Sequence, residues 1–173
     1  ANIKVNAMMD YIKEKVCDWN DDEEISKVLT KILGGRCFDR AGLLYGIGHA
    51  VYTISDPRAE LLRGFVEKLA ANKGYSEEFG LFRKVEKLAP GVIAGRKKMN
   101  RESLCANVDF YSGFVYRMLG LPQELFTPIF AVARMSGWSA HRMEELANNG
   151  KIIRPAYKPI MEDKDYISIE ERK

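Results

Sequence analysis

Apolar side chains recur every three or four residues along most of this chain, which is the period of an α-helix that buries one face. The clearest stripe lies in the first sixteen residues and comprises Val5, Met8, Met9, Ile12 and Val16. Strand-like alternation occurs only in two short segments, residues 152–153 and 166–169. This pattern predicts an all-α fold of several helices joined by short turns, followed by an irregular, charged tail beyond residue 154.

Several helix ends are marked by residues that satisfy unpaired backbone groups. Asp21 with Glu24 three positions later has the spacing of a capping box, and Asp56-Pro57 combines a cap with a proline suited to the first turn. Gly34-Gly35 and Pro90-Gly91 are typical of helix ends. The predicted helices cover residues 5–16, 22–33, 57–71, 76–89, 110–119 and 128–147.

The composition supports a folded domain and excludes several classes of protein. With 46% hydrophobic residues and 8 Phe, 8 Tyr and 2 Trp, the 173-residue chain can bury a core and is not disordered. No apolar run approaches the roughly 18 residues that cross a bilayer. Lysine and arginine exceed aspartate and glutamate by only 27 to 24, too small an excess to indicate nucleic-acid binding.

The three cysteines, Cys17, Cys37 and Cys105, are odd in number and widely spaced, without a CxxC pair. Such cysteines are typical of reduced thiols in a cytoplasmic protein. We therefore expect neither a disulfide framework nor a metal site.

The most distinctive segment is Gly46-Ile47-Gly48-His49, followed at a short distance by Asp56-Pro57-Arg58. The two glycines permit unusual backbone angles, let a ligand approach main-chain amides, and aim the imidazole outward at the end of an irregular loop. The alternative interpretation is a turn histidine that only caps a helix. The spacing by itself leaves both interpretations open.

Asp109 stands next to the predicted start of a helix, in the segment Asn107-Val108-Asp109-Phe110. One interpretation is an N-cap, which its position favours. The other is a general base, whose pKa the apolar neighbours Val108 and Phe110 would raise while the helix dipole would lower it.

Three arginines, Arg58, Arg134 and Arg154, lie in apolar or proline-flanked sequence. An arginine in such surroundings needs a partner, either an internal carboxylate or the carboxylate of a ligand, which the guanidinium fork fits. The basic segment at residues 96–101 is interpreted as a solvated loop, with a phosphate-bearing cofactor as the alternative, and it lacks the interleaved aromatic residues of a nucleic-acid site. His141 is expected to be structural or exposed.

Taken together, these segments resemble the carboxy-terminal part of the citrate synthases. Gly46-Ile47-Gly48-His49-Ala50-Val51-Tyr52 with Asp56-Pro57-Arg58 is similar to that family's GxGHxV…DPR signature, and Asn107-Val108-Asp109 is similar to its NVD motif. Phe130-Ala131-Val132-Ala133-Arg134, Gly137-Trp138-Ser139-Ala140-His141 and Ile153-Arg154-Pro155 resemble its last substrate-binding stretch. The order and separations agree from Ala1 to about Tyr157.

The resemblance implies a condensation of acetyl-CoA with oxaloacetate to give citrate and CoA. His49 would donate a hydrogen bond to the oxaloacetate carbonyl, and Asp109 would remove a proton from the acetyl-CoA methyl group. That methyl group is a very weak acid, so the enolate must be stabilised by fixed donors as it forms. A dianionic acceptor also requires several arginines, which are present.

The resemblance further implies which residues bind the substrates. Arg58, Arg134 and Arg154 would bind carboxylates, Arg154 across the interface of a homodimer, and Phe130 would lie beside the substrate. CoA would be a co-substrate, with no tightly bound cofactor. The residues implied for CoA are Leu43, Leu44, Tyr45, Gly46, Ile47, Gly48 and Asn107.

One departure from the family concerns its other catalytic histidine, which lies in an HGxAN motif. The chain begins with Ala1-Asn2, the last two letters of that motif. We therefore expect a carboxy-terminal fragment that is inactive alone, with the family's small domain at residues 1–125 and a returning large-domain helix and tail at 126–173.

Two alternatives remain for the function. A 2-methylcitrate synthase, which uses propionyl-CoA, would share every motif named above, since one methylene in an acyl pocket is worth only about 1–3 kcal/mol. The other alternative is a helical domain that binds CoA and carboxylates without catalysis.

Overall fold

The computed structural model describes residues 1–97, 104–150 and 168–172, which are mostly helical. The helices are α1 (Asn2–Lys15), α2 (Asp22–Leu33), α3 (Pro57–Lys73), α4 (Ser76–Lys97), α5 (Val108–Met118) and α6 (Phe126–Ala147), with short 3-10 turns at Gln123–Leu125 and Ile169–Glu171. Within these ranges no strand forms, and an isolated antiparallel bridge joins Ile47 to Ala106. The predicted all-α class is confirmed.

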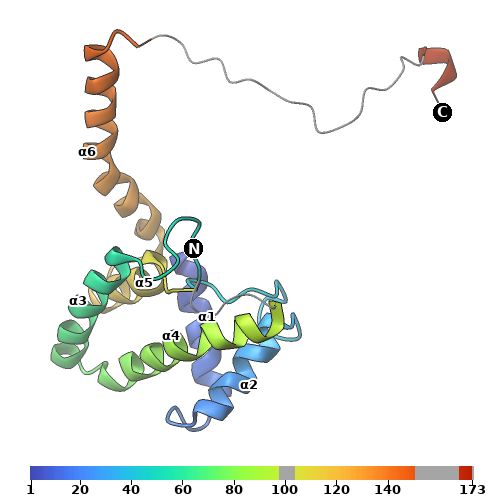
Figure 1. Ribbon diagram of the computed structural model, residues 1–173. Helices are drawn as coiled ribbons and strands as arrows, with labels where there is room; N and C mark the ends of the chain where they lie inside the picture. The colour runs from blue at the N-terminus through green and yellow to red at the C-terminus, as the bar shows by residue number, and fades with distance from the viewer. Residues whose placement is uncertain (98–103, 151–167, 173) are drawn as a thin grey trace. The chain divides into compact units, whose positions relative to one another are not determined.

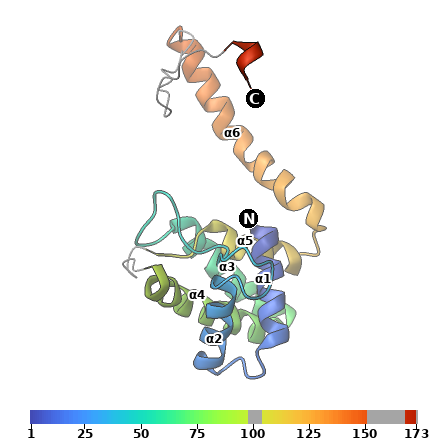
Figure 2. The same cartoon turned by 90° about the vertical axis from the view of Figure 1, so that its right-hand side faces the viewer.

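The chain divides into two compact units, residues 1–133 and 134–173. In the first unit the helices pack in a closed cycle: α1 on α2, α2 on α4, α4 on α3, α3 on α5, and α5 back on α1 (Figure 1, Figure 2). We call these five helices the helical ring. The second unit contains the remainder of α6 and the tail described at residues 168–172.

The core of the helical ring is filled from all its members. The buried residues of α1 and α2 are those of the predicted stripes: Val5, Met8, Met9, Ile12, Ile25, Val28, Leu29 and Ile32. Phe82 of α4 stacks on Phe114 of α5 with ring centroids 4.5 Å apart, and Phe110 meets Phe82 edge-on at 5.5 Å. Large aromatic rings bury much apolar area each, so this cluster contributes heavily to the stability of a small core.

Helix α4 continues past the stop predicted at Pro90-Gly91, so that prediction is wrong. Proline lacks an N–H group and usually kinks or ends a helix in its interior. On both sides of the proline, α4 buries Phe82, Val85, Ala89 and Ile93. Burial of this continuous face offsets the hydrogen bond that Pro90 cannot make.

Other boundaries differ by two residues from the sequence pattern. Helix α5 begins at Val108, where 110 was predicted, and α6 begins at Phe126, where 128 was predicted. Of the strand-like segments, Ile169 begins a 3-10 turn. Residues 152–153 and 166–167 lie outside the described residues.

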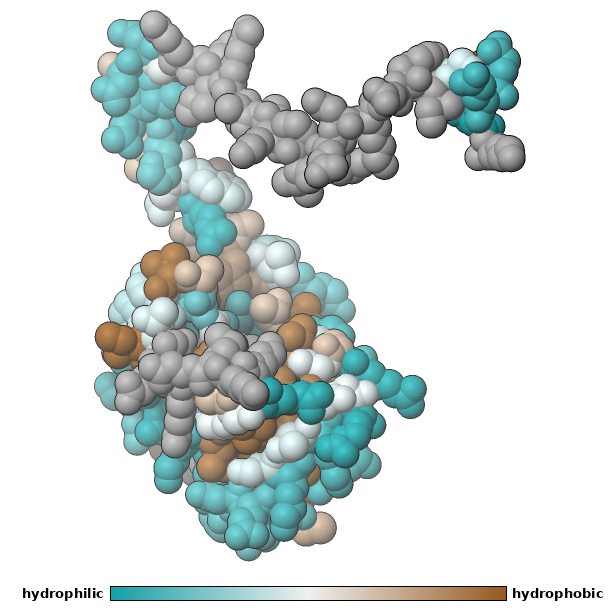
Figure 3. Space-filling model, turned by 45° about the vertical axis from the view of Figure 1, so that its right-hand side comes forward, coloured by the Kyte–Doolittle hydropathy of each residue, from teal (hydrophilic) through white to brown (hydrophobic). Residues whose placement is uncertain are grey.

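The surface of the helical ring mixes polar with apolar side chains (Figure 3). Helix α3 buries Ala59, Val66 and Ala70, whereas Leu61 and Phe65 are 65% and 57% exposed. Among the described helices, none combines the length and the apolar composition that a bilayer crossing requires. The three cysteines are free thiols.

Phe82→Ala should lower the free energy of unfolding by about 3–5 kcal/mol, because it removes a fully buried ring and leaves a cavity. Phe65→Ala is the matched control and should lower it by less than about 1 kcal/mol, since that ring is largely in solvent. Urea denaturation of both variants measures the difference. Equal losses would contradict the placement of the core between α4 and α5.

Candidate functional site

Residues 43–48, here called the glycine loop, lie against residues 105–107, far away in sequence. The backbone N of Gly48 donates to the carbonyl of Cys105 at 2.7 Å, and that of Asn107 donates to the carbonyl of Gly46 at 2.9 Å. The side chain of Asn107 adds a third link, because its Nδ2 donates to the Gly48 carbonyl at 2.8 Å. These bonds fix the backbone that leads directly into His49.

Gly46 is where the glycine loop contacts the helical ring. Its φ of +80° lies in the left-handed region that favours glycine. A Cβ here would lie 2.9 Å from both Val5 Cγ2 of α1 and Phe110 Cδ2 of α5. Glycine is therefore required at this position for both conformational and steric reasons.

Asp56 is a buried carboxylate that joins three parts of the site. It caps α3, and its Oδ1 accepts from the backbone N and the Nε of Arg58 at 3.0 and 2.9 Å. Its Oδ2 accepts from Arg58 Nη2 at 2.8 Å and from the backbone N of Val108, the first residue of α5, at 3.1 Å. Hydrogen bonding to Arg58 holds the pKa of Asp56 below its usual value although burial opposes this. Asp56 thus fixes Arg58 and the starts of α3 and α5 together.

His49 is oriented by the backbone that follows it. Its Nδ1 accepts from the backbone N–H groups of Val51 and Tyr52, both at 3.0 Å. Its ring packs on Tyr52 with centroids 4.8 Å apart, and the Arg58 guanidinium lies over the same Tyr52 ring at 5.5 Å. His49 closes a turn but caps no helix, because Asp56 is the cap of α3. The helix-capping interpretation of His49 is therefore wrong.

The hydrogen bonds on Nδ1 assign the tautomer of a neutral His49. A ring nitrogen that accepts from two amides carries no proton, so the proton lies on Nε2. That Nε2 is 3.2 Å from Arg58 Nη2, which is also a donor. Two donors therefore face the same space. An oxygen acceptor that lies to one side of this pair, within reach of both nitrogens, would accept a hydrogen bond from each.

Asp109 lies in the first turn of α5, and its predicted role as the N-cap is wrong. The cap is Asn107, whose Oδ1 accepts from the backbone N of Asp109 at 3.0 Å. Asn107 can take this role because its amide oxygen caps the helix while its amide nitrogen bonds the glycine loop. Val108 is half-buried and Phe110 is fully buried on either side of Asp109.

Electrostatic effects place Asp109 near Arg58 and Tyr116. The pKa of Arg58 is raised mainly by the hydrogen bond to Asp56, with a smaller contribution from Asp109. The pKa of Tyr116 is raised first by burial and then by the negative charge of Asp109. The ring of Tyr116 also contacts that of Phe130 in the first turns of α6, at a centroid distance of 6.2 Å. His49, Arg58 and Asp109 thus share one region of the first unit, and Phe130 is connected to it through its contact with Tyr116.

The structure does not place Arg134 and Arg154 relative to this region. Arg134 belongs to the second compact unit. Arg154 and most of the basic segment, residues 98–101, lie outside the described residues. His141 is exposed, as expected of a surface residue. Its Nδ1 lies 3.7 Å from Oε2 of Glu144 on the same helix.

Two contributors to the site were not predicted from the sequence: Asp56 as its buried anchor, and Tyr52 as the ring that contacts both His49 and Arg58. The first had a signal, because an aspartate cap two residues before an arginine can bind that arginine's side chain. The second had none, since an aromatic in a loop carries no periodic pattern.

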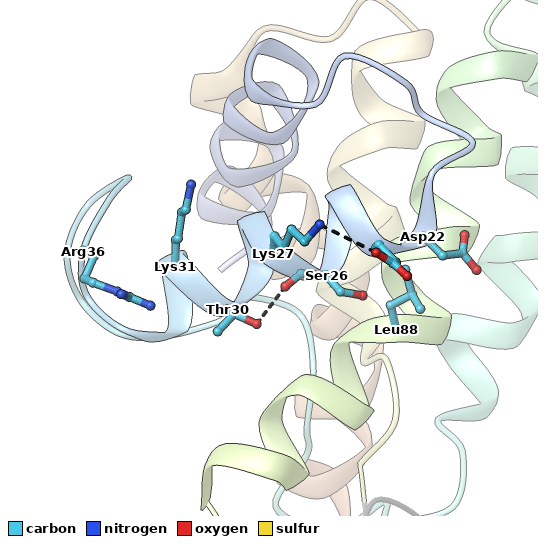
Figure 4. A pocket seen from close by; sticks show the side chains of 8 residues that line it. Asp22, Ser26, Lys27, Thr30, Lys31, Arg36 and Leu88 are labelled. Carbon is cyan, nitrogen blue, oxygen red and sulfur yellow. Dashed lines mark hydrogen bonds and ion pairs between the residues drawn. The ribbon is translucent and has the colours of Figure 1, made fainter.

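Among the described residues, neither a metal-ligand cluster nor the hollow on α2 belongs to the proposed site. Within the described ranges, His, Cys, Asp and Glu side chains nowhere gather in threes that could hold a metal ion. A hollow of about 610 Å³ runs along the outer face of α2 instead (Figure 4). Its lining residues are Asp22, Glu23, Ser26, Lys27, Thr30, Lys31, Arg36 and Leu88, none of which is a predicted site residue.

Asp56→Asn should lower the free energy of unfolding by about 2–3 kcal/mol at pH 7, because an amide cannot accept hydrogen bonds on both atoms and bonds to a charged acceptor are worth about 1.5–3 kcal/mol. Since the folded pKa of Asp56 is lowered, its stabilising effect is present above the ordinary carboxyl pKa and is lost as the pH falls. The difference from wild type should therefore shrink as the pH falls below about 4.

Asp21→Asn is the control for this experiment, because Asp21 caps α2 in an exposed position and asparagine caps about as well. Its unfolding free energy should stay within about 0.5 kcal/mol of wild type. Urea titrations across this pH range measure both variants. A pH-independent difference for Asp56→Asn would contradict the role of its charge.

Comparison with known proteins agrees with the geometry. The model of the family "Citrate synthase, C-terminal domain" matches residues 1–156. The citrate synthase of Synechocystis sp. is 41% identical over 120 residues, which are 69% of this chain and 28% of that protein. The 2-methylcitrate synthase of Shewanella oneidensis is 34% identical over 160 residues, which are 92% of this chain and 37% of that protein. The chain thus spans about a third of the length of these relatives.

A solved structure has the same fold. It is the citrate synthase of the thermophilic archaeon Thermoplasma acidophilum, in a ternary complex with carboxymethyl coenzyme A and oxaloacetate. The match has a TM-score of 0.68 and 27% identity, and covers 97% of this chain and 42% of that one. The family match over residues 1–156 and these relatives show that the chain belongs to the citrate synthase family, in the part that forms its carboxy-terminal domain.

Proposed function

We propose that this chain is the carboxy-terminal part of an enzyme that condenses acetyl-CoA with oxaloacetate and water to give citrate and CoA. The observation that carries the proposal is the pair of donors, His49 Nε2 and Arg58 Nη2, that face one space beside Asp109. The extent of the chain, about a third of its relatives' length, supports the view that a complete protein supplies the rest of the site.

In this mechanism His49 and Arg58 act on oxaloacetate. The Nε2–H of His49 donates to the carbonyl oxygen that becomes an alkoxide, which makes the carbonyl carbon more electrophilic. Arg58 binds an adjacent carboxylate, and its salt bridge to Asp56 leaves its other N–H groups for that purpose. Arg134 and Arg154 complete the carboxylate site, Arg154 from the partner subunit.

Asp109 acts on acetyl-CoA. Its carboxylate takes a proton from the methyl group, and the resulting enolate carbon attacks the polarised carbonyl of oxaloacetate. The alkoxide formed takes up a proton, and water then cleaves the thioester to release citrate and CoA. A carboxylate cannot deprotonate so weak an acid unaided, so the enolate oxygen needs a fixed donor. We assign that donor to the part of the complete protein outside these 173 residues. Phe130, linked to Asp109 through Tyr116, lies beside the substrate.

CoA binds at the glycine loop as a co-substrate. The proposed CoA residues are Leu43, Leu44, Tyr45, Gly46, Ile47, Gly48 and Asn107. Two observations support a role for the main-chain groups of this loop. Gly46 and Gly48 have a left-handed backbone, and Asn107 donates two hydrogen bonds to the loop. A pre-formed loop binds at a lower entropic cost than one that must be ordered.

We further propose that the complete protein is a homodimer whose assembly covers α6. That helix exposes a series of apolar side chains: Val132, Met135, Trp138, Met143 and Leu146. Large exposed apolar patches usually mark interaction surfaces. In the domain assignment that we propose, residues 1–125 form the small domain and α6 returns to the large domain.

A second candidate function is 2-methylcitrate synthesis from propionyl-CoA, which the 34% identity to such an enzyme favours. The acyl pocket discriminates one methylene by about 1–3 kcal/mol, or roughly 10- to 200-fold in kcat/KM. We expect the complete protein to have the higher kcat/KM with acetyl-CoA, measured by release of the CoA thiol in the presence of oxaloacetate. A higher value with propionyl-CoA would assign the second function.

Asp109→Asn in the complete protein should slow exchange of the acetyl-CoA methyl protons by about 10²–10⁴-fold and leave oxaloacetate binding intact, because only the general base is removed. His49→Ala should instead abolish the shift of the bound oxaloacetate carbonyl in the infrared spectrum. Calorimetry with oxaloacetate and methyl exchange followed by nuclear magnetic resonance separate the two effects.

Glu23→Gln is the control, since Glu23 is an acid in the first turn of α2 that takes no part in the proposed site. If Asp109 served only the helix dipole, Asp109→Asn would resemble this control and cost about 0.3–1 kcal/mol of stability with normal turnover. That result would overturn the proposed base.

A further inference from the structure

Asp39 precedes the glycine loop and makes more polar contacts than an ordinary loop aspartate. Its Oδ2 accepts from the hydroxyl of Tyr45 at 2.6 Å and from the Nζ of Lys4 on α1 at 2.9 Å. Its Oδ1 accepts from the backbone N of Ala41 at 3.1 Å. The side chain of Asp39 is 19% exposed. One carboxylate thus connects α1, its own turn and the glycine loop.

The backbone around Asp39 is held in an unfavourable conformation. Phe38 and Arg40 on either side have φ values of +59° and +58°, which residues other than glycine rarely adopt. Such strain persists where surrounding contacts over-determine the structure, and it concentrates at functional sites. Here the strained turn presents the carboxylate of Asp39 to Tyr45.

Aromatic contacts support the same arrangement. The ring of Phe38 lies 5.6 Å from that of Tyr11 on α1 and 6.3 Å from that of Tyr45. The Nζ of Lys4 is 6.0 Å from the Phe38 centroid and 5.7 Å from the Tyr45 centroid. The hydroxyl of Tyr45 is therefore held by Asp39 and its ring by Phe38. Both of these residues in turn contact side chains of α1.

Charge strengthens the bond between Tyr45 and Asp39. The hydrogen bonds from Tyr45 and then Lys4 lower the pKa of Asp39 to about 2, so the carboxylate is ionised at any working pH. The same contact raises the pKa of Tyr45, which keeps its proton. A hydroxyl that donates to an ionised carboxylate makes a shorter and stronger bond than a neutral pair.

Tyr45 is the residue directly before Gly46, and the loop is already fixed on its other side by Asn107 and Cys105. We infer that Asp39 is a positioning residue for the proposed CoA loop: through Tyr45 it sets the conformation of residues 46–48, and Lys4 balances its charge. This inference rests on the proposed function only for the identity of the ligand. Asp39 itself touches no substrate in this scheme.

The test uses the complete protein with and without CoA as the probe. In Asp39→Asn and in Tyr45→Phe, amide hydrogen exchange at Gly48 and Asn107 should accelerate roughly tenfold, because a charge-assisted bond that holds the loop is lost. The dissociation constant for CoA should rise by about five- to tenfold. The double variant should show no faster exchange and no weaker CoA binding than the more affected single variant, because both changes remove the same hydrogen bond.

Tyr75→Phe is the matched control, because it removes a hydroxyl from the turn between α3 and α4, where the ring contacts Phe114. Its loop exchange and CoA affinity should equal those of wild type. Amides within α2 should exchange unchanged in all variants, which separates a loosened loop from a destabilised fold. Tyr45→Phe deletes one oxygen atom and keeps the test valid if Asp39→Asn misfolds.

The outcomes distinguish this inference from the proposed function. Unchanged exchange at Gly48 and Asn107 in Tyr45→Phe overturns the positioning role, whatever CoA does. A wild-type complete protein that fails to bind CoA, together with a loop that loosens in the variants, refutes CoA as the ligand and supports the positioning role. Faster exchange with an unchanged CoA affinity overturns the inference that the position of this loop matters for CoA.

Discussion

The arrangement of the site depends on the carboxylate of Asp56. It is almost completely buried, and it is stable there because two of its four hydrogen-bond donors belong to a guanidinium and two are backbone amides at the starts of different helices. A buried charge with so complete a set of partners sets distances that weaker contacts could not. The position of Arg58 beside His49 follows from it, and so does the approach of α5, which carries Asp109, to α3.

The second organising element is the side-chain amide of Asn107, whose oxygen and nitrogen bind different parts of the site. Its oxygen caps α5, while its nitrogen bonds the loop that ends at His49. A single amide thereby couples the position of Asp109 to that of His49, although sixty residues separate them. An aspartate could not replace it, because a carboxylate has no N–H to donate. The glycine loop is supported on its opposite side by Tyr45 and Asp39, so both of its ends are tied to helices.

The fold class, the stripes of α1 and α2, and the caps at Asp21 and Asp56 could be predicted from the sequence because each depends on neighbours within four residues. The identities of His49, Arg58 and Asp109 followed from motifs, and the structure brings these three into one region. Pro90 was misjudged because the buried face of α4 outweighs a local rule. The bond from Asn107 to the glycine loop and the contact of Asp39 with Lys4 join residues 59 and 35 positions apart, which no local pattern reveals.

The lack of free space at Gly46 has a consequence for motion. Because even a Cβ atom at Gly46 would lie 2.9 Å from Val5 Cγ2 and Phe110 Cδ2, the loop is packed closely on α1 and α5, and lifting it alone would leave a void beside these helices. Packed interiors resist such deformation and respond by moving in larger pieces. Any opening that admits or releases a ligand must therefore carry the loop together with α1 and α5 as a rigid body.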